Sequence, residues 1–123
     1  MSKLIVTTVE ASGSTLTLND NTTVNGTLTA TDVNTSSDIA LKQDITTIPN
    51  ASEILSSLRG VNFEWKKDNK ESIGVLAQEV EAVLPQIVAT DANGLKAVNY
   101  AALTGVLIEA VKDLQAQVAK LSK

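Results

Sequence analysis

The C-terminal stretch of the sequence carries an apolar seam that a small domain does not cover by itself. In "NYAALTGVLIEAVKDLQAQVAKLSK" the apolar residues recur at gaps of four, three, four and three. Val in a positions and Leu in d positions over about two heptads is the pattern of a coiled coil. An amphipathic helix packed on its own domain is the alternative, but the persistence of the seam favours association between chains. The seam residues are Leu107, Val111, Leu114, Val118 and Leu121.

The composition also favours self-association. The chain has 123 residues, 43% of them apolar, yet Phe63, Trp65 and Tyr100 are its only aromatic residues. A chain of this size buries a smaller share of its surface than a large domain does. Val at a and Leu at d favours two strands in parallel coiled coils, whereas an intertwined β-stalk is easier to build from three chains. The residues alone leave the number of chains open.

The sequence changes character at about residue 36. Residues 1–36, here called the stalk segment, are rich in Thr, Ser, Asn, Val and Leu, with short alternating apolar runs separated by Asn and Gly. This pattern predicts short strands with tight turns. We expect these strands to wrap with the same segment of other chains, and a disordered tail is the alternative. Residues 37–123 predict a small α+β domain.

The second part predicts alternating helices and short strands. The run "IPNASEILSSLRG" indicates a helix with Asn50 as N-cap and Gly60 as its stop. "VNFEW" has the alternation of a half-buried strand, and "SIGVLAQEVEAVLP" begins extended and turns helical at about Ala77. Asn93–Gly94 between two extended runs predicts a hairpin. A final helix spans about residues 99–122 and is capped by its first residue.

Composition and charge exclude several classes of function. The net charge is −4, and the basic stretch "WKKDNK" is interrupted by an aspartate, so no nucleic-acid partner is expected. Without Cys or His the chain has no disulfide, no zinc site of the usual kind and no Ser-His-Asp triad. The chain has no apolar run near the ~20 residues of a membrane span and no signal-peptide core. No phosphate-binding glycine loop is visible either, and we predict no cofactor and no metal.

One pair of residues suggests nucleophilic chemistry without imidazole. In "NTSSDIALKQDI", Ser37 precedes Lys42 by five positions. A serine hydroxyl becomes a good nucleophile when a neighbouring base takes its proton. A lysine amine serves as that base only when it is neutral, and burial in an apolar setting favours the neutral form. The flanking Ile39, Leu41 and Ile45 supply apolar surface that assembly would close over the amine.

The spacing of this pair imposes a bend in the chain. Residues five apart point to opposite faces of a strand and lie about 140° apart around a helix. Ser37 and Lys42 therefore meet only through a turn around Asp38–Ala40, which Asp38 would stabilise, or across two chains. Oxyanion donors would be backbone N–H groups of the turn or the Gln78 amide. A surface or capping role for Gln78 is the alternative.

Four motifs in order resemble a known family. "SSDIALKQDI", "LRGVNFEWKKD", "IGVLAQEVEAVLPQIV" and "LKAVNYAALTGVLIEAVKDL" are similar to the S74 peptidase family, the intramolecular chaperone domains of bacteriophage tail spikes and fibres. The resemblance covers residues 36 to about 121. It implies a homotrimer that templates a triple-stranded β-stalk in the upstream fibre or spike segment and then cuts itself off. It also implies a virion protein, in the tail fibre or spike, that is assembled in the host cytoplasm.

The resemblance assigns roles to the Ser–Lys pair. It implies that Ser37 is the nucleophile, Lys42 its general base and Ser36–Ser37 the scissile bond of a single-turnover serine endopeptidase. Ala40 stands where the family motif often has arginine, so a charge that could orient the loop is missing, which bears on the rate of cleavage more than on the fold. Cleavage would leave only 36 residues behind. Either the chain is the tip of a larger spike, or the domain stays uncut as a trimeric clamp on a short stalk, and an uncleaved structural fibre component is the second hypothesis.

Overall fold

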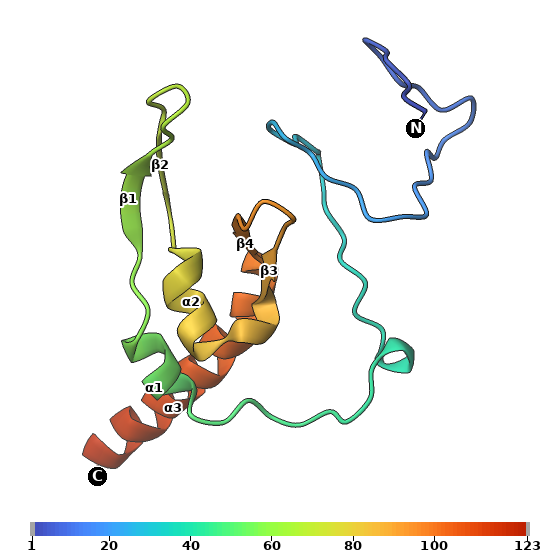
Figure 1. Ribbon diagram of the computed structural model, residues 1–123. Helices are drawn as coiled ribbons and strands as arrows, with labels where there is room; N and C mark the ends of the chain where they lie inside the picture. Colours follow the sequence, from blue (N-terminus) through green and yellow to red (C-terminus); the bar gives the residue numbers. More distant parts are fainter. Residues whose placement is uncertain (1, 123) are drawn as a thin grey trace. The chain divides into compact units, whose positions relative to one another are not determined.

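The computed structural model describes residues 2–122 and divides the chain into two units, Met1–Lys42 and Gln43–Lys123 (Figure 1). In the first unit the described residues form one short 3-10 helix, Ile39–Leu41, and no strand. The short strands predicted for residues 1–36 are thus absent from residues 2–36. A strand needs a hydrogen-bonded neighbour to exist, and among the described residues none of 2–36 pairs with another strand.

The stalk segment leaves its apolar side chains in contact with solvent. Leu4, Ile5, Leu28 and Val33 are each more than 70% exposed. Conformational entropy opposes the ordering of a segment that buries so little apolar surface. Within residues 2–36 the chain therefore provides no apolar core for this segment.

The second unit is a small α+β fold built on one long helix. Helix α1 (Ala51–Ser56) packs against α3 (Leu103–Leu121). Helix α2 (Ala77–Val83) packs on the hairpin of β3 (Val88–Thr90) and β4 (Lys96–Val98). The buried core consists of Ala51, Val80, Leu84, Val106 and Ala110. Alanines at the contact between α1 and α3 allow the two helices to approach closely. The predicted α+β class with a long C-terminal helix is confirmed for this unit.

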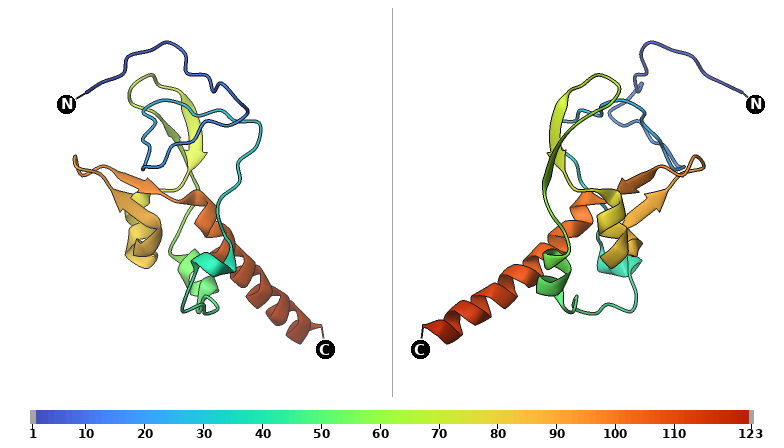
Figure 2. Two further views of the ribbon diagram at one scale, coloured as in Figure 1. Left: turned by 90° about the vertical axis from the view of Figure 1, so that its right-hand side faces the viewer. Right: turned by 60° about the vertical axis from the view of Figure 1, so that its left-hand side comes forward.

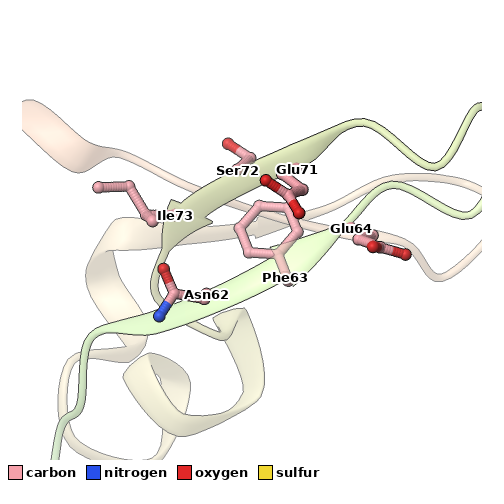
Figure 3. Close-up of a pocket in the computed structure, with 6 residues that line it drawn as sticks. All are labelled: Asn62, Phe63, Glu64, Glu71, Ser72 and Ile73. Carbon is pink, nitrogen blue, oxygen red and sulfur yellow. The ribbon is translucent and has the colours of Figure 1, made fainter.

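Two separate antiparallel hairpins extend from the helices (Figure 1). Strands β1 (Val61–Glu64) and β2 (Glu71–Gly74) form the first, and β3 (Val88–Thr90) and β4 (Lys96–Val98) form the second. The second is the hairpin predicted from the Asn–Gly pair. Figure 3 shows side chains of the first hairpin, in which Glu64 lies opposite Glu71. Like charges in directly opposite positions weaken a strand pair, so the first hairpin depends on support from outside itself.

Helix α1 is shorter than the sequence predicts. It ends at Ser56 rather than at Gly60, and Asn50 takes the N-cap position with a φ of 58° and no capping hydrogen bond from its side chain. At the other end Ser56 Oγ donates to the Ser52 carbonyl at 3.0 Å. Serine hydroxyls that bond to nearby carbonyls compete with the backbone bonds of a helix. This local competition weakens the last turn of the helix, at which α1 ends.

The start of the final helix agrees with its predicted cap. The Asn99 side chain accepts a hydrogen bond from the Ala102 N–H at 3.2 Å. A 3-10 turn, Tyr100–Ala102, follows the cap and leads into α3. Between residues 2 and 122 no helix combines the length and the apolar character that crossing a membrane requires.

Tyr100 connects this turn to the first hairpin. Its hydroxyl accepts a hydrogen bond from the Val75 N–H at 3.1 Å. The same oxygen lies 2.5 Å from the position that a Cβ on Gly74 would occupy. Only glycine at the end of β2 therefore leaves room for the tyrosine. This contact supplies the outside support that the first hairpin needs.

We expect Gly74→Ala to destabilise the second unit. The added methyl group meets the Tyr100 hydroxyl, and overpacking of this kind costs about 1–3 kcal/mol. Tyr100→Phe loses the hydrogen bond from the Val75 N–H at 3.1 Å and the longer one to the Val75 carbonyl at 3.5 Å, about 0.5–1.5 kcal/mol each. The double variant should be more stable than the sum of both losses implies, because the phenylalanine removes the oxygen that the methyl group meets. Urea unfolding at equal protein concentration, followed by fluorescence of the single tryptophan Trp65, measures all three; strict additivity would contradict the contact.

Candidate functional site

The predicted bend between Ser37 and Lys42 is a single 3-10 turn. Asp38 is its N-cap, and its Oδ1 accepts a hydrogen bond from the Ala40 N–H at 2.8 Å. The Leu41 N–H donates to the Asp38 carbonyl at 3.0 Å. An aspartate that closes a turn on its own backbone in this way is an Asx turn. The turn that the five-residue spacing required is confirmed, and it lies within one chain.

The turn brings the two predicted site residues into direct contact. Lys42 Nζ donates a hydrogen bond to Ser37 Oγ at 2.7 Å, the shortest separation of the side-chain hydrogen bonds among the described residues. This distance meets the requirement that a base lie within hydrogen-bond reach of the proton that it removes. Catalysis needs the bond in the opposite direction, in which the neutral amine accepts the hydroxyl proton.

The surroundings of the pair are open in the single chain. Ser37 and Lys42 are both exposed. Ile39, Leu41 and Ile45 remain 75%, 73% and 62% exposed, so the apolar wall predicted around the amine is absent from the part of the chain that the structure describes. Ser37 and Lys42 are therefore in contact, but the burial that the sequence predicts around the Lys42 amine is not formed among the described residues.

Of the two predicted supporting residues, Asp38 and Gln78, only Asp38 belongs to the turn that joins Ser37 and Lys42. Asp38 lies in the turn, whereas Gln78 is an exposed residue of α2 in the other unit, and no hydrogen bond of its side chain is formed among residues 2–122. Ala40 contributes only its backbone N–H to the turn. The turn thus closes without the arginine that the family motif often has at this position.

The predicted seam forms one open face of α3. Leu107, Val111, Leu114 and Val118 are about half exposed, and Leu121 is 86% exposed. Val106 and Ala110, on the adjacent face, are buried against the rest of the unit. Figure 2 shows that the C-terminal turns of α3 extend beyond α1 and the other elements of the unit. One apolar face of the helix is therefore used within the chain and the other is free.

A groove between the two hairpins was not predicted from the sequence. It has a volume of about 860 Å³, and its walls come from β1, β4 and the junction of β2 with α2. Its apolar lining includes Trp65 and Tyr100, both about half exposed. These residues are far apart in the sequence, and no local spacing pattern connects them. The groove exists only because the fold brings the two hairpins and the start of α2 together.

Comparison with known proteins gives a family for the part of the chain that contains the Ser37–Lys42 pair. Residues 37–89 match the model of the family Peptidase_S74, described as chaperone of endosialidase. Long tail fiber protein Gp37 of Salmonella phage S16 is 34% identical over 109 residues, which are 80% of this chain and 15% of that protein. Long tail fiber protein Gp37 of Escherichia phage AR1 is 35% identical over 92 residues, 67% of this chain and 8% of that protein. The chain thus spans a small part of the length of these relatives.

Proposed function

Because residues 37–89 belong to the chaperone-of-endosialidase family, Peptidase_S74, we propose that this chain is the trimerisation chaperone of a phage tail fibre and cleaves itself before Ser37. The fibre proteins of two phages resemble most of the chain, which supports a role as a component of the virion. The observation that carries the enzymatic part is the contact of 2.7 Å between Lys42 Nζ and Ser37 Oγ.

The position of the nucleophile determines the course of the reaction. Ser37 provides both the attacking oxygen and the nitrogen of the scissile bond. Neutral Lys42 takes the hydroxyl proton while Oγ attacks the carbonyl carbon of Ser36, closing a small ring through Cβ, Cα and N of Ser37. The C–N bond then breaks, and the Lys42 ammonium returns its proton to the leaving amine. An ester joins Ser36 to Ser37 Oγ at this stage.

Water completes the cleavage. It adds to the carbonyl carbon of the ester, the bond to Oγ breaks, and Ser37 recovers its hydroxyl group. The products are a carboxylate on Ser36 and a free amino group on Ser37. The turn capped by Asp38 contributes by holding the base at the nucleophile, so that the two groups need no further ordering before reaction.

Assembly provides the switch in this proposal. The exposed Ile39, Leu41 and Ile45 are available to neighbouring chains, whose approach would remove water from the Lys42 amine. Loss of hydration favours the neutral form that acts as base. Three seams closing around a common axis would bring the chains together, and the stalk segments would pair at the same time. Cleavage would then follow correct assembly and not precede it.

The second candidate function is an uncleaved structural fibre component. In it the same trimer persists as a clamp on the stalk. The exposure of Ser37 and Lys42 and the alanine at position 40 favour this candidate, since both features lower the expected rate. The two functions share the fold and the assembly, and they differ only in the covalent state of the Ser36–Ser37 bond.

Replacement of Lys42 tests the proposed base directly. We expect Lys42→Met to slow self-cleavage by about 10²–10⁴-fold, the usual contribution of a general base. The methionine keeps most of the apolar stem, so the assembled mass should not change. Intact mass measured under denaturing and native conditions reports both properties. Lys66→Met, which removes an equal charge from the first hairpin, should cleave like the wild type; loss of cleavage in both variants would contradict the assignment.

A further inference from the structure

The chain contains two Asn–Gly pairs in very different surroundings. Asn25–Gly26 lies in the stalk segment, and Asn93–Gly94 lies in the turn between β3 and β4. We propose that Asn25 is the main site of spontaneous deamidation while the stalk segment is unpaired, and that the turn protects Asn93. The part of this inference that concerns paired stalks rests on the proposed function.

The reaction needs only the chain and water. The backbone nitrogen of the glycine loses its proton and attacks Cγ of the asparagine side chain. A new N–Cγ bond closes a succinimide ring, and the amide nitrogen leaves as ammonia with the proton. Water then opens the ring at either carbonyl, which gives aspartate or isoaspartate. Glycine favours the step because no Cβ obstructs the approach of its nitrogen.

The turn at Asn93 restrains the attacking nitrogen. The Gly94 N–H donates to the Asp91 carbonyl at 3.0 Å, and Gly94 has a φ of 80°. The Asp91 carboxylate accepts from the Asn93 N–H at 2.8 Å and from the Leu95 N–H at 3.0 Å. Cyclisation requires the Gly94 nitrogen to lose its proton and turn toward Asn93 Cγ, so this bonded turn must first open.

No such restraint acts at Asn25. The two residues lie in an exposed bend, and within residues 2–122 the Gly26 N–H takes part in no hydrogen bond. Nothing lies within 4 Å of the position of a Cβ on Gly26. The backbone nitrogen and the Asn25 side chain are therefore free to reach the attacking geometry. Hydrogen bonds between paired stalk segments would remove this freedom.

The product would affect assembly. Isoaspartate routes the main chain through one additional methylene group, and either product adds a negative charge. A strand with an additional backbone atom changes register with its neighbours, and a shift of register moves apolar side chains to the wrong face. Chains that fail to assemble would thus become marked at position 25 and lose the ability to join a stalk.

Peptide mass spectrometry over time tests the inference. The full chain carries Ser37→Ala so that both sites remain on one polypeptide, and it is incubated at mildly alkaline pH with and without Leu114→Asp, which blocks the seam. In the unassembled chain we expect Asn25 to deamidate on the order of tenfold faster than Asn93. Dilution below the assembly concentration gives the same comparison if the seam variant does not fold.

Denaturant separates the effect of structure from that of sequence. In concentrated urea the two sites should deamidate at similar rates, because the turn around Asn93 is lost. Equal rates in the native unassembled chain, or a rate ratio that urea leaves unchanged, would overturn the inference. In the assembled chain Asn25 should be slow. If it remains fast there, paired stalk segments are wrong as part of the proposed function, while the difference between the two sites stands.

Discussion

The Ser37→Ala variant is expected to remain at full length under conditions in which the wild type separates into residues 1–36 and 37–123. Alanine lacks the oxygen that attacks the Ser36 carbonyl, and no other group lies in the same place relative to that bond. Removal of a nucleophile that acts with a base costs many powers of ten in rate, about 10⁶ in a well-studied serine protease. A denaturing gel and an intact mass measurement distinguish the two species without ambiguity.

Ser36→Ala is the matched control for this experiment. It makes the same side-chain change one position earlier and leaves both Ser37 and the turn in place. Since Lys42 contacts Ser37, the control should cleave. Ser37→Thr keeps a hydroxyl group and should retain partial activity. If Ser36→Ala also stays uncut, the assignment of Ser37 as the nucleophile is wrong. If the wild type itself stays intact after assembly, the result favours the uncleaved clamp.

Trapping the ester distinguishes the proposed course from direct attack by water. Hydroxylamine added during cleavage should compete with water for the Ser36 carbonyl and leave a hydroxamate at the end of the released segment. Direct hydrolysis of the peptide bond passes through no ester and gives only the carboxylate. The mass of the released segment separates these outcomes, and the Ser37→Ala variant should give neither product.

The local features of the site follow from the sequence because they depend on short-range geometry. A separation of five residues is incompatible with a contact on either a helix or a strand, and the structure resolves it with the turn capped by Asp38. Four motifs in register likewise predicted the family, which the match to residues 37–89 confirms. Backbone geometry over a few residues and the order of motifs are both determined by the sequence alone, so they can be predicted without knowing the fold.

Features that depend on distant contacts were not predicted. The hydrogen bond between Val75 and Tyr100 joins residues far apart in the sequence, and it determines why glycine stands at position 74. The early end of α1 is different, because the Ser56 and Ser57 hydroxyls bond to carbonyls only four residues earlier, a local contact that the apolar pattern does not report. The apolar wall predicted around Lys42 is also absent from residues 2–122, where Ile39, Leu41 and Ile45 stay exposed.

The second large effect is expected at the seam. Leu114→Asp places a carboxylate in the middle of the open face of α3, where Leu114 is 58% exposed in the single chain. If the face is buried between chains, association covers only this exposed part, and the change forfeits roughly 1–2 kcal/mol of apolar burial per chain, before the cost of the charge. Each 1.4 kcal/mol is about tenfold in an equilibrium constant. Self-association of three chains should weaken by about a thousandfold or more.

The matched control is Ala116→Asp, which adds the same charge to the opposite face of the same helix. It leaves every seam residue in place, so its sedimentation should equal that of the wild type. The residues that flank the seam in heptad register are Ile108, Ala110, Gln115 and Gln117. None of these residues is charged, so no ion pair beside the seam can be screened by salt. The loss of self-association in Leu114→Asp therefore reflects the apolar seam.

The same variant connects assembly to chemistry. If neighbouring chains must cover Lys42 before it acts as a base, Leu114→Asp should sediment as a single folded subunit and stay uncut, although its Ser37 and Lys42 are unchanged. Raising the protein concentration should restore assembly and cleavage together. A variant that sediments alone yet cleaves at the wild-type rate would separate the two events, because the contact at Ser37 would then be sufficient without a trimer. A variant that assembles normally would show that the chains meet through a surface other than this face of α3.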